Sequence, residues 1–409
     1  MSTYRRFFKA PLWAGIDLNS ISQNDLLRVW GRKITLIVRP LNFCYYPAMK
    51  LRLPFCVFLP WIGLAALSSA EGILTPAASN FNKESGYLTF YLDNDVFGGQ
   101  DKDYTNGFRV SWISDDRKES ELGLIQRGLR ILSGDSESFD FMQKITGFDD
   151  PSKVRYNYGF SLTQLMYTPQ DYEPFYQPED QRRYAGWLGL GMSLHVKDDS
   201  VINSIELTIG TTGPNSYAEH TQDFIHDLKG SPTFNGWDNQ IPNEITGDLS
   251  FVQKRRSDFL TRGEGAITMD GLTQWGLRLG TFRTEAQLGG FFRVGYNLPS
   301  DFSDPRLSDT AYSHRYFGQD EDYTSKWSIY SLFGTMAHAV AFDATLDGPM
   351  FHSFETGNTR EPFVGEVFTG IGVRYKSVEF SYVHTWRTQE YREQVSDSNF
   401  GSLAMRVRF

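Results

Sequence analysis

In residues 184–196, YAGWLGLGMSLHV, an apolar side chain occupies every second position from Leu188 to Val196, and Gly, Ser and His fill the positions between them. A period of two is that of a β-strand, in which successive side chains point to opposite faces. Soluble sandwiches alternate as well, so the period alone leaves both classes open. The division into an apolar face and a Gly, Ser and His face is typical of a transmembrane barrel, which has a lipid face and a polar lumen.

The same alternation recurs along the rest of the chain, with Tyr and Trp near the segment ends, as in the aromatic girdles of barrels. The last segment, SLAMRVRF at 402–409, ends on Phe409. Outer-membrane barrels resemble one another in this ending, so we expect the barrel-assembly machinery to recognise Phe409. We predict an all-β fold, a transmembrane antiparallel β-barrel of about 12 strands, an even number as in bacterial single-chain barrels. The predicted strands lie near 86–97, 104–114, 155–168, 183–196, 202–211, 246–255, 262–280, 285–297, 327–344, 363–375, 377–391 and 400–409. Two of these segments, 262–280 and 327–344, are long enough to contain an additional pair of strands.

The composition excludes two other classes of protein. The chain has 409 residues, a net charge of −9 and a mean hydropathy of −0.39, and it lacks repeated apolar stretches of helical length. A polytopic helical membrane protein needs about 20 nearly continuous apolar residues for each span, so that class is excluded. An acidic chain is also unsuited to nucleic acid, whose phosphates bind basic surfaces.

The N-terminal segment reads as a targeting signal. Residues 49–70 contain two basic residues, an apolar stretch and small residues ending at Ala70, the layout of a secretory signal peptide. An N-terminal anchor helix is the alternative, but the apolar stretch is short for a span and contains two prolines. We expect 1–48 to be an over-long start and 71–409 to be the barrel domain. Residues 1–70 hold nine Lys or Arg and two Asp or Glu, so their removal changes the net charge from −9 to −16.

Oxygen-bearing side chains crowd the end of the first predicted strand and the start of the second, in YLDNDVFGGQDKDYTNGFRVSW at 91–112. Clustered carboxylate and amide oxygens are ligands that Ca²⁺ prefers. A solvated acidic loop closed by a turn is the alternative. The members of this oxygen cluster are Asp93, Asn94, Asp95, Asp101, Asp103, Thr105 and Asn106.

A short helix is predicted in the loop after the fifth strand, TIGTTGPNSYAEHTQDFIHDLKG at 208–230. Asn215 or Ser216 can cap its start. Gln222 and His226 are four residues apart, so their side chains project from the same side of the helix. A solvated or core histidine is the alternative reading of His226.

Topology brings these features together. With the N-terminus in the periplasm, odd-numbered strands run outward, so the predicted site residues share the outer rim of the barrel. A neutral histidine, a cation held by oxygens and an amide donor can hydrolyse an ester. His226 would take a proton from water, and the cation and Gln222 would hold the developing oxyanion. The residues placed at this rim are Asn94, Asp95, Thr105, Arg182, Arg183, Gln222 and His226.

These motifs carry a resemblance. The D-N-D-x-F run at 93–97, the D-Y-T-N-G run at 103–107 and the G-P…Q-x-x-x-H element at 213–226 resemble those of the lipid A 3′-O-deacylase family of Gram-negative outer membranes. The resemblance implies a barrel in the cell outer membrane that removes the 3′-acyloxyacyl group from lipid A, the anchor of lipopolysaccharide. It also implies Ca²⁺ as cofactor.

Individual positions match the family as well. Asn94 and Asp95 match its paired amide and carboxylate, and Thr105 matches the threonine that opens the second strand; these three are the implied Ca²⁺ ligands. Gln222 matches the oxyanion-side glutamine and His226 the general base. In addition, Arg182 or Arg183 stands where the family has a basic residue that could bind a lipid A phosphate.

Two other functions remain open at this point. A porin-like or adhesin barrel would use the acidic loop for structural Ca²⁺ alone, although 12 strands leave little open lumen. An outer-membrane phospholipase would differ from the lipid A enzyme in head-group recognition alone. A serine lipase is disfavoured, because the sequence has no Gly-x-Ser-x-Gly motif.

Overall fold

A computed structural model describes most of the predicted barrel domain. The predicted signal peptide 49–70, the segment 1–48 and Phe409 lie outside the described residues. The described residues are 86–95, 103–117, 147–148, 153–171, 173–178, 180–229, 234–257, 266–299, 301–302, 304–307 and 327–408.

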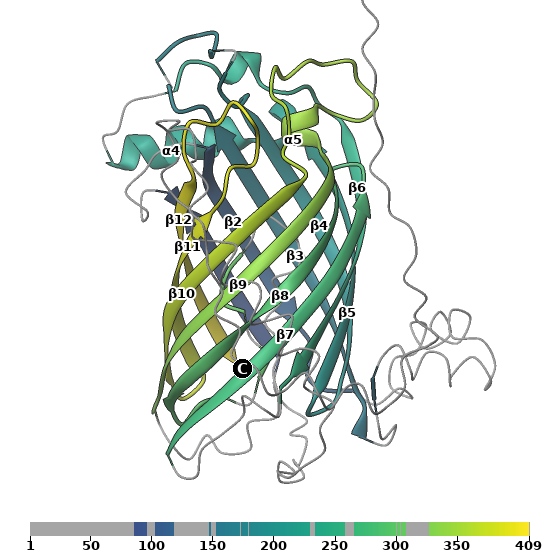
Figure 1. Cartoon of the computed structure of the whole chain (residues 1–409), viewed down its shortest axis with the longest axis vertical. Helices are drawn as coiled ribbons and strands as arrows, with labels where there is room; N and C mark the ends of the chain where they lie inside the picture. The colour runs from purple at the N-terminus through teal and green to yellow at the C-terminus, as the bar shows by residue number, and fades with distance from the viewer. Residues whose placement is uncertain are drawn as a thin grey trace, which may run out of the picture. The chain divides into compact units, whose positions relative to one another are not determined.

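Twelve antiparallel strands form a closed barrel, in which β1 pairs with β12 (Figure 1). This confirms the predicted fold class, and each strand overlaps one predicted range. The described parts of 262–280 and 327–344 hold one strand each. The strands are β1 (Tyr87–Asn94), β2 (Asp103–Ile113), β3 (Arg155–Thr168), β4 (Ala185–Lys197), β5 (Val201–Thr212), β6 (Ile245–Arg256), β7 (Ile267–Gly280), β8 (Arg283–Tyr296), β9 (Trp327–Asp343), β10 (Phe363–Tyr375), β11 (Val378–Arg387) and β12 (Ser398–Arg408).

The outward face of the wall is apolar. On β4, Leu190 and Met192 are 66% and 54% exposed, whereas Gly191 between them and Ser193 after them are buried on the lumen side. Large exposed apolar side chains in such a band are the surface that membrane hydrocarbon covers. Aromatic rings gather near the strand ends, for example where Trp327 and Tyr375 pack with centroids 4.6 Å apart. The chain is thus apolar where it meets lipid although its mean hydropathy is negative.

Charged side chains pair across the lumen. Arg109 on β2 donates to Glu206 on β5 at 2.9 Å and to Thr163 on β3 at 3.2 Å. All three side chains are buried. Burying charges costs several kcal/mol unless they are paired, so these inward positions satisfy one another.

The segment that follows β8 lies inside the barrel. Its residues 301–302 and 304–307 are buried. Asp301 accepts a hydrogen bond from Arg406 on β12 at 3.2 Å, and Arg306 donates to Glu366 on β10 at 2.7 Å. This inner segment therefore ties β10 and β12 together through the lumen.

Replacing Asp301 with alanine is expected to destabilise the barrel by about 3–5 kcal/mol, because it leaves Arg293 and Arg406 buried without this carboxylate. Urea unfolding in detergent micelles, followed by circular dichroism, measures the effect. The control is Arg392→Ala, which breaks an exposed pair with Glu361 at 3.4 Å and should cost about 0–1 kcal/mol. Equal losses from the two variants would contradict a supporting role for the inner segment.

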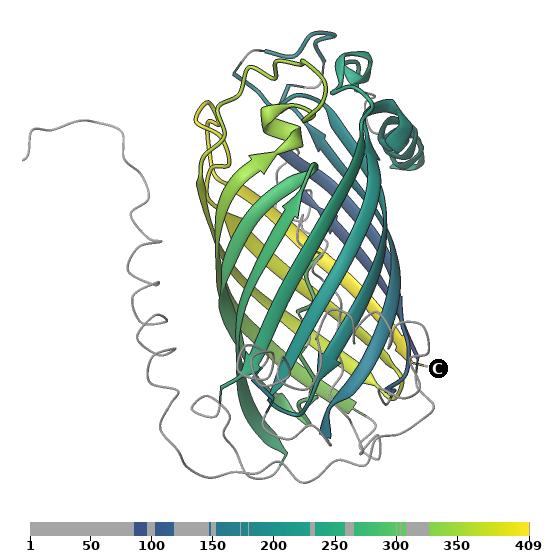
Figure 2. The ribbon, with the colours of Figure 1, turned by 90° about the vertical axis from the view of Figure 1, so that its right-hand side faces the viewer.

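Short helices gather at the end where β1 ends and β2 begins, which we call the upper end; the C-terminus lies at the other end (Figures 1 and 2). Among the described residues, no helix is long and apolar enough to cross a membrane. The short helices are η5 (Gly213–Ser216), α4 (Ala218–Lys229), η6 (Trp237–Asn239) and α5 (Ala344–Asp347).

Helix α4 is the short helix predicted after the fifth strand. The chain turns toward it at Gly213, where φ is +70° and a Cβ atom would lie 2.6 Å from the carbonyl oxygen of Ile241. Glycine is the residue that adopts this backbone without strain. At the helix start, Ser216 Oγ accepts from the backbone N–H of Ala218 at 3.4 Å, so Ser216 rather than Asn215 stands nearest to a cap.

Candidate active site

Polar side chains interrupt the apolar outward face near the upper end. Asn94 on β1 pairs in register with Asn106 on β2, Asn106 with Met166 on β3, and Met166 with Gly186 on β4. Adjacent strands are about 4.8 Å apart, so the four positions form one continuous row across the wall. Leu92 continues the same outward face below Asn94. We call Asn94, Asn106, Met166 and Gly186 the outer row.

The polar members of the outer row are buried. Asn94 is 8% exposed, Asn106 is 6% exposed and the adjacent Asp95 is 1% exposed. Among the described residues, Asn106 Oδ1 has no hydrogen-bond partner. A buried oxygen without a donor costs free energy, unless a bound ligand supplies the missing interaction. The row is therefore suited to a polar ligand or a cation on the side of the wall that faces lipid.

Helix α4 covers one end of the outer row from outside the barrel (Figure 2). A Cβ atom at Gly186 would lie 2.5 Å from Ala218 Cβ, so glycine lets the helix approach the wall. Gln164 on β3 donates to the backbone oxygen of Ser216 at 2.7 Å. The sequence predicted that the site lies at the rim of the barrel. In the structure, α4, which carries Gln222 and His226, packs against the outward face of β3 and β4.

Gln222 and His226 lie on this helix, one turn apart. Gln222 is 4% exposed, and its Oε1 accepts a hydrogen bond from Trp237 Nε1 at 2.7 Å. Its Nε2 is buried and has no hydrogen-bond partner among the described residues. His226 is half-buried, and its ring meets the ring of Phe234 edge-on at 4.9 Å between centroids. One amide donor is thus left available beside a histidine.

Acidic side chains surround the first turn of α4. Burial, with repulsion from Asp223 and Asp238, raises the pKa of Glu219 above its ordinary value, and His220 acts in the opposite direction. Among the described residues, no three His, Cys, Asp or Glu side chains are grouped so that they could hold a metal ion by themselves. A cation site here therefore depends on the amide oxygens of the outer row as well as on Asp95.

Three predicted site residues lie apart from this arrangement or are described in part. The backbone of Thr105 forms a β-bulge in β2 between Tyr104 and Asn106, and its side chain lies outside the described residues. Arg182 is fully buried and donates to Glu390 at 3.1 Å and to Thr345 at 2.5 Å.

Arg183 donates to the backbone oxygen of Thr356 at 2.9 Å. A phosphate at Arg182 would have to displace the carboxylate of Glu390, with which Arg182 is already paired. The structure therefore does not bring either arginine together with the outer row. Phosphate binding by these two residues stays a prediction.

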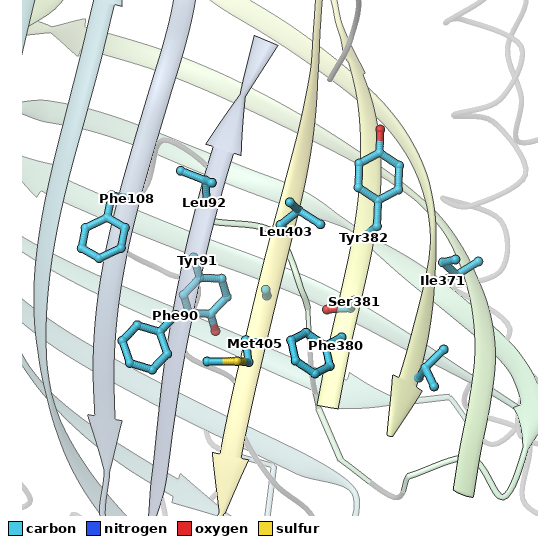
Figure 3. Close-up of a pocket in the computed structure, with 12 residues that line it drawn as sticks. Phe90, Tyr91, Leu92, Phe108, Ile371, Phe380, Ser381, Tyr382, Leu403 and Met405 are labelled. Atoms are coloured by element: carbon cyan, nitrogen blue, oxygen red, sulfur yellow. The ribbon is translucent and has the colours of Figure 1, made fainter. Parts of the chain in front are cut away.

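An apolar hollow lies on the outward face beside the outer row (Figure 3). Its volume is about 510 Å³, and it extends over β1, β2, β10, β11 and β12. Leu92, in its wall, precedes Asn94 by two residues on the same face, a distance of about 7 Å along a strand. The apolar side chains in its wall include Phe90, Leu92, Phe108, Phe380, Leu403 and Met405.

Some residues of this site were missed in the sequence. Asn106 was placed in the oxygen cluster but was not chosen as a ligand, although it follows Thr105 directly. The signal for Asn106 is the strand register, which pairs it with Asn94. Phe234 follows α4 in a loop and Trp237 begins η6, and nothing in the local sequence shows that they reach back to Gln222 and His226.

The fold and the site together define an outer-membrane β-barrel with a polar site on its lipid-facing side. The chain belongs to the family described as outer membrane protein LpxR, whose model matches residues 61–409. This finding confirms the resemblance drawn from the sequence motifs and the location of the protein in the cell outer membrane.

Solved structures agree with the fold. LpxR from Salmonella typhimurium superimposes with a TM-score of 0.60 at 16% identity, over 79% of this chain and 100% of that chain. The β domain of the Bordetella autotransporter BrkA has a TM-score of 0.37 at 9% identity, over 80% of this chain and 100% of that one. At 16% identity, the first similarity supports the fold and nothing more. The second, with a TM-score below 0.5, is too weak to support a shared fold. No curated protein matches the chain.

Proposed function

We propose that this protein is an outer-membrane ester hydrolase that removes the 3′-acyloxyacyl group from lipid A. The observation that carries the proposal is the available amide donor of Gln222, which shares with His226 the helix α4, and this helix lies outside the barrel wall. Membership of the family supports a lipid A deacylase. A site on the lipid-facing side suits a substrate whose ester lies in the membrane.

In the proposed reaction, His226 accepts a proton from water as the oxygen of that water attacks the ester carbonyl. The Nε2 amide of Gln222 donates to the oxyanion that forms at the carbonyl oxygen. The bond between the acyl carbon and the sugar oxygen then breaks, and His226 gives the proton to that sugar oxygen. The products are a free acyloxyacyl acid and lipid A with a hydroxyl at its 3′ position.

The residues at the upper end of β1 and β2 fit a Ca²⁺ cofactor. Asn94, Asp95 and Asn106 are buried oxygen donors, one of them a carboxylate, and Asn106 Oδ1 has no partner among the described residues. Thr105 is the further ligand that the family resemblance implies. When bound, Ca²⁺ would supply positive charge that stabilises the oxyanion.

The apolar hollow supports an acyl substrate. It adjoins the outer row on the lipid-facing side, so an acyl chain whose ester lies near Asn94 could extend over Leu92 without leaving apolar surroundings. The lumen, by contrast, holds the buried ion pairs of the inner segment, among them Arg306 with Glu366. Such a lumen does not support a porin. Recognition of Phe409 by the barrel-assembly machinery remains a prediction.

Cells that express the protein are expected to lose the mass of the 3′-acyloxyacyl group from their lipid A, as measured by mass spectrometry against cells without it. Purified protein in a planar bilayer should pass no steady current, since the inner segment lies in the lumen and is ion-paired to β10 and β12. Unchanged lipid A with clear conductance would favour the porin. Hydrolysis of glycerophospholipid with lipid A left intact would assign the protein as a phospholipase.

A further inference from the structure

The segment after α4 holds the catalytic side of that helix against the barrel. Trp237 and Phe234 are buried, and both pack on Tyr184, which immediately precedes β4, with ring centroids 5.0 Å and 6.4 Å apart. Phe234 also meets His226, and Trp237 hydrogen-bonds Gln222. This segment thus contacts both residues of the proposed site on the helix.

The contact with Trp237 sets which atom of the Gln222 amide is available. An indole N–H can donate a hydrogen bond but cannot accept one. The Gln222 atom 2.7 Å from Trp237 Nε1 must therefore be the carbonyl oxygen, and the amide nitrogen must point elsewhere. Without this donor, the oxygen and nitrogen ends of the amide are nearly the same shape and could exchange places.

The amide nitrogen of Gln222, at the other end of the amide, is the atom that remains for a ligand. Gln222 Nε2 is buried and has no hydrogen-bond partner among the described residues. Leaving a buried donor unpaired costs about 1–3 kcal/mol. Such a cost is tolerated at a site where a ligand supplies the acceptor, as an oxyanion does during ester hydrolysis.

We propose that Trp237 is a positioning residue, which locks the Gln222 amide so that its N–H rather than its oxygen faces the reacting carbonyl. This inference rests on the proposed function of Gln222. An amide turned the other way would present a partial negative charge to the oxyanion and oppose the reaction. Burial raises the pKa of Tyr184, against which Trp237 packs, to about 12, so this packing partner stays uncharged.

The variant Trp237→Phe keeps an aromatic ring against Tyr184 but removes the indole N–H. We expect kcat for lipid A deacylation to fall about tenfold, the loss of one neutral hydrogen bond that orders the amide, with KM within about twofold of the wild type. Trp187→Phe is the matched control. Trp187 is a buried indole facing the lumen that donates to Thr246 at 2.9 Å, and its loss should leave kcat unchanged.

A double-mutant cycle separates positioning from a structural role. If Trp237 acts through Gln222, Trp237→Phe should lower kcat in the wild-type background and have no further effect in a Gln222→Ala background. Equal losses in the two backgrounds would overturn the inference, as would a loss in Trp187→Phe as large as that in Trp237→Phe.

A readout that does not depend on activity completes the test. The indole ¹H–¹⁵N resonance of Trp237 should move in Gln222→Ala and stay in place in Trp187→Phe, because the hydrogen bond to Gln222 is lost in the first variant alone. An unmoved resonance in Gln222→Ala would overturn the hydrogen bond itself. The Trp237 resonance could move in Gln222→Ala although the wild-type protein leaves lipid A intact. That result would keep the hydrogen bond but overturn the proposed function and, with it, the catalytic part of this inference.

Discussion

Replacing His226 with alanine is expected to lower kcat for lipid A deacylation by about 10²–10⁴-fold, because water loses the base that takes its proton. The measurement is the initial rate of acyl release from lipid A in detergent micelles, followed by mass spectrometry. The folded barrel should remain, since His226 lies on α4, a helix outside the barrel wall. Circular dichroism and heat-dependent migration on a gel check the fold.

His220→Ala is the matched control for this variant. His220 lies on the same helix but is exposed, and its ring meets that of Tyr217 at 5.9 Å rather than the ring of Phe234. Its removal should change kcat by less than about twofold, as expected for a solvated side chain remote from the chemistry. Full activity in His226→Ala, with both variants folded, would show that another group is the base.

The strands could be predicted because their pattern is strictly local. A shift of one residue moves every side chain of a strand to the other face, so an apolar outward face fixes which positions face lipid. The stretch 184–196 shows this for β4: Leu190 and Met192 are the exposed positions, as its alternation requires. Strand ends were less certain, because turn residues extend the alternation; the predicted strand 377–391 ends at Arg387 in the structure.

The end of the barrel at which Asn94, Asn106 and α4 lie could be predicted from the sequence, but the side of the wall on which they lie could not. Connectivity alone gives the end of the barrel at which β1 and β2 meet. The outward placement follows from register and parity, which put Asn94 and Asn106 on the same face as Leu92. The close approach of α4 at Gly186 then covers that face, and the sequence offers no signal of this contact.

Contacts between distant residues account for the remaining differences. Arg182 or Arg183 was matched to a basic residue of the family that could bind a lipid A phosphate. The structure pairs Arg182 with Glu390, which lies 208 residues later in the chain. Likewise, nothing local indicates that Asp301 enters the lumen to meet Arg406. Such pairings arise when the barrel closes, and no periodicity along one strand reports them.

Replacing Asp95 with alanine is expected to weaken Ca²⁺ binding by at least about 100-fold, because it removes the buried carboxylate of the proposed cation site. A chelator should abolish deacylation by the wild type, and added Ca²⁺ should restore it. In Asp95→Ala, the same Ca²⁺ concentrations should restore none. Isothermal titration calorimetry measures the binding, and acyl release measures the activity.

Glu361→Ala separates loss of a ligand from loss of a negative charge. Glu361 is a partly exposed acid, paired at 3.4 Å with the exposed Arg392, in the connection between β9 and β10. Its removal changes the net charge by the same amount as Asp95→Ala but leaves the outer row intact, so Ca²⁺ affinity and activity should stay within about twofold of the wild type. If Asp95→Ala bound Ca²⁺ as tightly as Glu361→Ala does, the cation would lie elsewhere. Cation binding would then not explain why Asn94 and Asn106 are buried on the lipid-facing side of the wall.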